Sequence, residues 1–135
     1  MSPRSRLLAA RILSVLYLAA VIWLCFGQFD SVPDVPRSLW GIPMDKVVHF
    51  LMFLPFPLLA YGALGVRPRS FFLSLLLVAG IFAAGLVLSG GTEVVQSYLS
   101  WRSGDLRDFE ADTLALGISS GIVLLIETVR QIRRR

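Results

Sequence analysis

Four hydrophobic runs separated by short polar stretches form the main pattern of this sequence. They cover residues 7–26, 47–64, 71–89 and about 111–129. A helix needs roughly 20 predominantly apolar residues to cross the hydrocarbon core of a bilayer. The pattern therefore predicts an all-α integral membrane four-helix bundle, with all of residues 1–135 in a single domain.

The runs also contain signals about helix shape and packing. Pro55 and Pro57 lack a backbone N–H, so we expect them to kink the second span. Residues 28–44, rich in Pro and Asp, predict an exposed loop. Close helix packing is expected where the third run places small residues four apart, in the pairs Ala79 with Ala83 and Gly80 with Ala84.

The fourth run is short for a membrane span. Only 14 residues separate Asp112 from Glu127, and they rise about 21 Å as a helix against a core of about 30 Å. Either the helix continues through Val129, or it begins earlier and draws Asp112 and Asp108 into the outer leaflet. A carboxylate at that depth costs several kcal/mol without a partner, so the second alternative predicts a partner or a polar cavity.

Composition and charge support this interpretation. With 56% hydrophobic residues among 135, a soluble domain could not bury its apolar surface. The net charge of +4 comes from basic residues at helix ends, which indicates membrane orientation rather than nucleic-acid binding. The positive-inside rule predicts cytoplasmic N- and C-termini, because this topology places nine basic residues inside and four outside.

Polar residues at three helix ends form a candidate site. Asp45 and His49, Glu93 and Gln96, and Asp108 and Asp112 are pairs three or four apart, each on one helix face. The topology brings all three ends to the external side of the membrane. Arg102 is the expected counter-charge, since a guanidinium can bridge two carboxylates, and Lys46 is a second cation.

Simpler roles are open for these residues. Asp45 could be only an N-cap, Asp108 and Asp112 could only complement the helix dipole, and the whole set could be a network that fixes helix packing. We expect three further charges nearby to be solvated loop residues: Asp105, Arg107 and Glu110.

The same residues resemble the VanZ-like family of small bacterial membrane proteins. The resemblance covers roughly residues 45–121 and rests on the order and spacing of "DKVVHFLMFLPF", "EVVQ", Arg102 and "DFEAD". Asp112 stands where the family usually has Asn, and Ala115 where Gly is expected. The resemblance implies a multi-pass protein of the bacterial cell membrane, and the family's founding member is tied to low-level resistance to the glycopeptide teicoplanin. It implies no reaction.

Three functions compete at the sequence level, and whether the chain is an enzyme stays open. The first is an envelope-associated accessory or binding protein, in which Arg102 and Lys46 contact anionic groups of a lipid headgroup, a lipid-linked precursor or a partner protein. The second is a membrane-embedded enzyme with Glu93 or Asp108 as general base and His49 as acid or proton shuttle. The third is a transporter, for which four spans are few.

Partners and cofactors follow from the same residues. We expect the lipid bilayer as partner, with a lipid-linked envelope precursor and a homo-oligomer left open, and no nucleic acid. We expect no cofactor and no metal; with one histidine, a metal site would suit Mg²⁺ or Mn²⁺ better than Zn²⁺.

Overall fold

The computed structural model describes residues 2–27, 38–100 and 104–134. In this part of the chain, four helical stretches are long and apolar enough to cross a membrane, and the second of them is made of two helices. The predicted all-α class with four long apolar helices is therefore confirmed. The elements in chain order are α1 (Pro3–Phe26), β1 (Ser38–Leu39), β2 (Ile42–Pro43), α2 (Met44–Phe53), α3 (Phe56–Leu64), α4 (Phe71–Gln96) and α5 (Leu106–Ile132).

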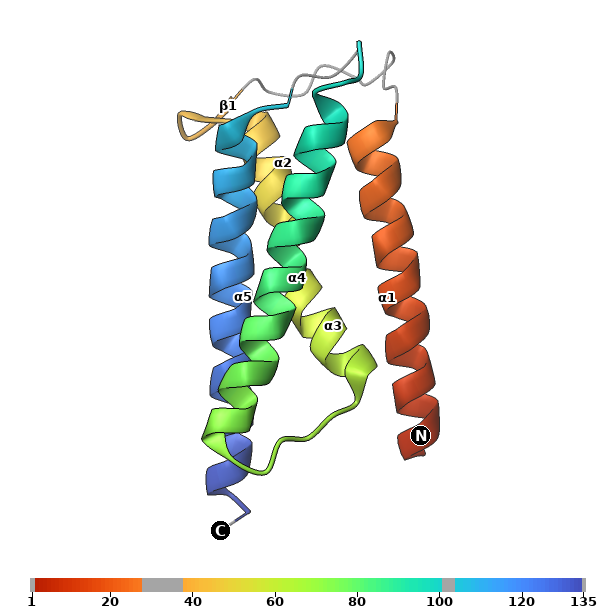
Figure 1. Ribbon diagram of the computed structural model, residues 1–135, viewed down its shortest axis with the longest axis vertical. Coiled ribbons are helices and arrows are strands. Elements are labelled where there is room, and N and C mark those ends of the chain that lie inside the picture. The colour runs from red at the N-terminus through yellow and green to blue at the C-terminus, as the bar shows by residue number, and fades with distance from the viewer. Residues whose placement is uncertain (1, 28–37, 101–103, 135) are drawn as a thin grey trace.

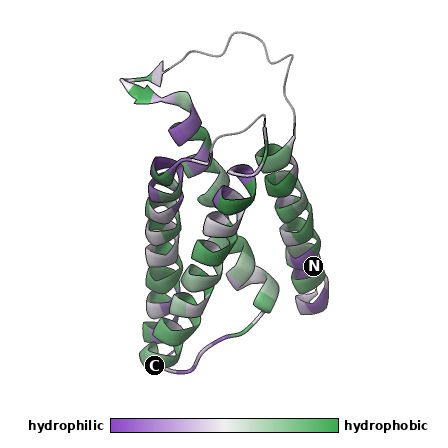
Figure 2. Ribbon diagram, turned by 45° about the horizontal axis from the view of Figure 1, so that its top comes forward, coloured by the Kyte–Doolittle hydropathy of each residue, from purple (hydrophilic) through white to green (hydrophobic). Residues whose placement is uncertain are grey.

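The helices run along the long axis of the molecule (Figure 1). The helix α5 packs against α4 and α2, whereas α1 packs mainly against α3. The N-terminal end of α1 and the C-terminal end of α5 lie at one end of the molecule, and the start of α2 and of α5 lie at the other. Figure 2 shows hydrophilic residues gathered toward the helix ends and hydrophobic residues between them. The described residues of the predicted site, at the starts of α2 and α5 and the end of α4, thus lie at the end opposite the chain termini.

The second span breaks where the two prolines predict a kink. The helix α2 ends at Phe53 and α3 begins at Phe56, because Pro55 and Pro57 cannot donate the backbone hydrogen bonds of a continuous helix. Beside the break, the carbonyl oxygen of Met52 accepts a hydrogen bond of 2.7 Å from the hydroxyl of Tyr17 on α1. This bond ties the broken span to its neighbour.

The helices α4 and α5 approach each other closely at Gly85. A Cβ added there would lie 2.6 Å from Cδ2 of Leu116, which is fully buried. The close helix packing expected at the small residues four apart is not found between the described helices, because these four residues are exposed on the surface of the chain. They are Ala79, Gly80, Ala83 and Ala84. The buried face of α4 instead follows Val78, Ile81, Gly85 and Ser89.

The short fourth run is extended at both ends. The helix α5 has 27 residues, which span about 40 Å, so Asp108 and Asp112 lie inside it. At the end of α4 the helix continues without a break through Gly90 and Gly91 to Gln96. Within the stretch predicted as an exposed loop, β1 and β2 form a ribbon whose turn residues, Trp40 and Gly41, have φ of 51° and 83°; residues 28–37 lie outside the described chain.

Candidate functional site

Three helix ends supply the candidate site, and each predicted residue except Arg102 has a described position. Arg102 lies outside the described residues. From α2 come Asp45, Lys46 and His49; from α4 come Glu93 and Gln96; from α5 come Asp108 and Asp112. The contacts below connect all of these except Gln96, whose side-chain amide donates instead to the carbonyl oxygen of Cys25 on α1 at 2.9 Å.

The ammonium of Lys46 joins α2 to α5. Its Nζ lies 2.9 Å from Asp45, 2.7 Å from Asp105 and 2.5 Å from Asp108. A lysine has three N–H donors, so these carboxylates use all of them. Lys46 therefore serves as a counter-charge, the role that the sequence suggested for Arg102. The expectation that Lys46 contacts anionic groups of a ligand stays a prediction; in the structure its ammonium contacts these three carboxylates.

Asp105 is one of the carboxylates that contact Lys46, and the sequence analysis did not include it in the candidate site. It is the N-cap of α5, where its Oδ1 accepts the backbone N–H of Arg107 at 2.9 Å, so its interpretation as a solvated loop charge is wrong. The hydrogen bond from the Lys46 ammonium holds the pKa of Asp105 below its ordinary value. The missed signal is an aspartate directly before a helix. Asp45 is not an N-cap, because Pro43 holds that position and Asp45 lies in the first turn of α2.

Next to the ion pairs of Lys46 lies a group of three buried titratable side chains. His49, Glu93 and Asp112 are 8%, 9% and 0% exposed. The Nδ1 atom of His49 is 3.2 Å from Oδ1 of Asp112 and 3.7 Å from Oε1 of Glu93. Its Nε2 atom faces Oδ2 of Asp108 at 3.8 Å. The imidazole is thus placed among three carboxylates, an arrangement that can hold and transfer a proton.

Two further hydrogen bonds fix these carboxylates. Asp112 accepts the hydroxyl of Ser89 at 2.6 Å, and Oε2 of Glu93 accepts the backbone N–H of Asp105 at 3.0 Å. The polar pairs in the sequence did not predict Ser89, because a serine inside a hydrophobic run usually bonds to its own helix. Its position four residues before Glu93, on the same face of α4, was the available signal.

One carboxylate oxygen in the buried group is unsatisfied. Among the described residues, Oε1 of Glu93 is buried without a hydrogen-bond partner, which costs about 1–3 kcal/mol in a protein interior. Within the described residues, which do not include Arg102, one ammonium and one imidazole face five carboxylates, those of Asp45, Glu93, Asp105, Asp108 and Asp112. The chemistry of this group favours a ligand that brings positive charge or hydrogen-bond donors.

Among the described residues, two sets of side chains have the spacing of metal ligands. In each, the ligand atoms lie within 4.8 Å of one another: His49, Glu93 and Asp112 form one set, and Asp45, Asp105 and Asp108 form the other. The ammonium of Lys46 already contacts all three residues of the second set. The first set offers one imidazole and two carboxylates, which suit Mg²⁺ or Mn²⁺.

A second polar network, also missed, lies at the opposite end of the molecule. Glu127 is fully buried and accepts hydrogen bonds from the hydroxyl of Tyr61 and from Nη1 of Arg130, the latter at 2.7 Å. Arg130 also donates to the Tyr61 hydroxyl at 3.1 Å. The available signal was a single acidic residue within an arginine-rich segment.

Comparison with known proteins gives one distant relationship. No protein-family model matches the chain, and no solved structure matches it. The chain is 30% identical over 109 residues to the uncharacterized protein C11E3.10 of Schizosaccharomyces pombe. The match covers 81% of this chain and 60% of that relative, so the chain spans less than two thirds of the relative's length. The comparisons therefore provide a distant fungal relative and no family assignment.

Proposed function

We propose that the chain is a VanZ-like, multi-pass membrane protein that binds a lipid headgroup in an accessory role at the cell envelope. The order and spacing of "DKVVHF", "EVVQ" and "DFEAD" support the family. The distribution of basic residues supports cytoplasmic termini and an external polar site. We place the protein in a bacterial cell membrane on the strength of the family resemblance.

The unsatisfied Oε1 of Glu93 carries the proposal of a binding site. It lies beside His49 and Asp112, where the ends of α2, α4 and α5 meet. A ligand group with N–H donors and positive charge would satisfy this oxygen and offset the excess of carboxylates among the described residues. The ammonium of a zwitterionic phospholipid has both properties.

The headgroup chemistry also bears on the wider role. Because the relative described above is fungal, a headgroup shared by many membranes fits better than a wall precursor of one kind of envelope. A link to glycopeptide resistance would require a lipid-linked wall precursor as ligand, and the same binding measurement tests that ligand.

Catalysis is the second candidate, and the position of His49 favours it. A histidine with one ring nitrogen 3.2 Å from a buried carboxylate and the other facing Asp108 resembles a general acid–base arrangement. Glu93 would act as base and His49 as proton carrier on a lipid-linked substrate. Ser89 is fully buried and donates to Asp112, which leaves it poorly placed as a nucleophile.

Native mass spectrometry of protein in nanodiscs tests the binding proposal. Nanodiscs contain equal amounts of phosphatidylethanolamine and phosphatidylcholine, whose bulkier trimethylammonium cannot donate N–H bonds. We expect wild type to retain phosphatidylethanolamine selectively, and E93Q to lose the selectivity by about tenfold, the equivalent of one charge-assisted hydrogen bond. The matched control is R107Q, which changes an exposed side chain in the same region.

Two outcomes separate the candidates. Equal retention of both lipids by wild type, or equal selectivity in E93Q and R107Q, would contradict the binding proposal. Turnover of an added lipid-linked precursor that is lost in H49Q would favour catalysis.

A cysteine at Ser100, which is exposed before the start of α5, tests orientation: it should react with an impermeant thiol reagent applied to intact cells.

A further inference from the structure

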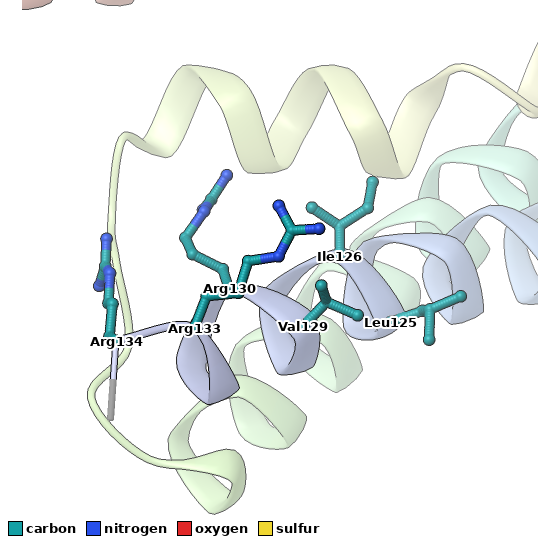
Figure 3. A pocket seen from close by; sticks show the side chains of 6 residues that line it. All are labelled: Leu125, Ile126, Val129, Arg130, Arg133 and Arg134. Carbon is teal, nitrogen blue, oxygen red and sulfur yellow. The ribbon is translucent and has the colours of Figure 1, made fainter.

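Two cavities lie at the end of the molecule that carries the chain termini, away from the polar site. The larger, about 640 Å³, lies between α1, α3 and the end of α5, and Arg4, Arg6, Arg67 and Arg130 line it. The smaller cavity, about 500 Å³, is lined by residues from successive turns at the C-terminal end of α5. Its arginines are Arg130, Arg133 and Arg134. Arg130 belongs to both. Figure 3 shows these α5 side chains in the space next to the neighbouring helix.

The charge around these cavities is strongly positive. Together they are lined by six arginines. Within the described chain, Arg130 is the one among them with an ion-pair partner, which is Glu127. Glu127 is also the only acidic residue in the sequence after Asp112. A hollow lined by charges of one sign concentrates the field and attracts a counter-ion.

Aliphatic side chains form part of the walls of both cavities. Leu7 and Val66 contribute to the larger cavity, and Leu125 and Val129 to the smaller. Leu125 is 64% exposed and Val129 is 39% exposed, on a helix long and apolar enough to cross a membrane. Each cavity therefore combines guanidinium groups with aliphatic surface that continues toward the lipid-facing side of the bundle.

Arg130 is held in place between the two cavities. Its Nη1 donates to the buried Glu127 at 2.7 Å and to the Tyr61 hydroxyl at 3.1 Å. An arginine already fixed by neighbours loses less side-chain entropy when it binds a ligand, and its planar fork matches phosphate oxygens. Arg130 therefore provides a fixed cation. The exposed arginines of α1, of the α3–α4 link and of the end of α5 can contact a ligand that is bound to it.

We propose that this arginine-lined pair of cavities binds a phosphate group, and specifically the phosphate of an anionic phospholipid. Guanidinium–phosphate pairs are frequently bidentate, and basic pockets between transmembrane helices bind anionic headgroups. The aliphatic walls favour the lipid over soluble phosphate, because they can bury the first part of an acyl chain. The site is separate from the polar cluster, and the proposal does not depend on the function proposed for that cluster.

Lipid retention in nanodiscs tests this proposal with charge-matched variants. The probe is phosphatidylglycerol mixed with phosphatidylcholine, and bound lipid is measured by native mass spectrometry. R4Q/R67Q removes two cavity arginines, whereas R69Q/R107Q removes two exposed arginines outside both cavities. We expect R4Q/R67Q to retain phosphatidylglycerol at least about tenfold more weakly than wild type, and R69Q/R107Q to stay within about twofold.

Further arms distinguish the phosphate source and guard against misfolding. Protein without lipid is titrated with inorganic phosphate: binding that R4Q/R67Q abolishes supports the phosphate site with soluble phosphate as ligand, and retention of phosphatidylglycerol alone supports the lipid. If R4Q/R67Q fails to fold, R133Q/R134Q at the exposed end of α5 takes its place. Equal losses in cavity and control variants, or no binding of either probe, would overturn the proposal. E93Q acts at the other end, so the two proposals fail independently.

Discussion

Replacing Lys46 by methionine removes the ammonium that three carboxylates share, while it keeps an unbranched side chain of similar length. The exposed fraction of each partner decides the expected loss of stability. The side chains of Asp45 and Asp105 are 56% and 42% exposed, so water and salt screen their pairs with Lys46. The side chain of Asp108 is 9% exposed, and its 2.5 Å contact with Lys46 is the pair that matters most.

The expected magnitude follows from this buried pair. Breaking a buried ion pair costs about 3–5 kcal/mol, and Lys46 itself is largely enclosed, with 13% of its side chain exposed. We therefore expect K46M to lower the free energy of unfolding by about 3 kcal/mol. R107Q removes an exposed cation from the first turn of α5, next to Asp108. It is expected to change the free energy of unfolding by less than about 0.5 kcal/mol.

The assay is reversible unfolding in mixed micelles with increasing dodecyl sulfate, followed by circular dichroism. The double variant K46M/D108N should recover much of the loss, because it also removes the carboxylate left without its ammonium. If K46M and R107Q unfold at the same denaturant fraction, Lys46 does not hold the cluster together and its assignment as counter-charge is wrong.

Three other predictions use the same unfolding assay. G85A should cost about 1–3 kcal/mol, because its Cβ would lie 2.6 Å from Leu116, whereas G80A meets no atom within 4 Å and should stabilise the helix by about 0.5–1 kcal/mol; effects of the same sign would contradict the packing. S89A should cost about 1–3 kcal/mol by leaving the buried Asp112 without its hydroxyl donor, and S100A, at an exposed position, should be neutral; equal stability of the two variants would refute that bond. The pKa of Asp105 is lowered in the folded state, so its contact with Lys46 stabilises the fold above pH 3.8, its ordinary pKa, and this stabilisation is lost as pH falls through the folded pKa. Below pH 3.8 the wild type should therefore lose more stability than D105N. Parallel pH profiles of the two proteins would count against the contact.

Spacing along the sequence was enough to locate the polar site. Pairs such as Asp45 with His49 and Asp108 with Asp112 define one face of a helix, and alternating membrane crossings assign their helix ends to one side. Lys46 was harder to place, because a long flexible side chain can reach partners on several elements. Its three contacts come from two helices and a cap, and no local pattern encodes that combination.

The inward face of α4 could not be predicted for a different reason. In a soluble helix, polar residues mark the outer face, but lipid-facing and buried residues of a membrane helix are both apolar. Ala79 and Ala83 have the spacing of an interface and are nevertheless exposed. In such a helix the rare polar residues indicate the inner face better than the small ones, as Ser74, Ser89 and Thr92 do here.

The glycine at the contact of α4 and α5 has a consequence for related sequences. The two helices run in opposite directions, and contacts recur every four residues on each: Gly85 faces Leu116, and one turn further on Ser89 bonds Asp112 at 2.6 Å. A bulkier residue at 85 would separate the helices and stretch the bond on the next turn. Homologues are therefore expected to share a joint spacing, small-x₃-Ser-x₃-Glu on one helix with Asp-x₃-Asp/Asn-x₃-Leu on the other, since either Asp or Asn can accept the serine hydroxyl. Positions 85 and 116 should vary in volume together, one growing as the other shrinks.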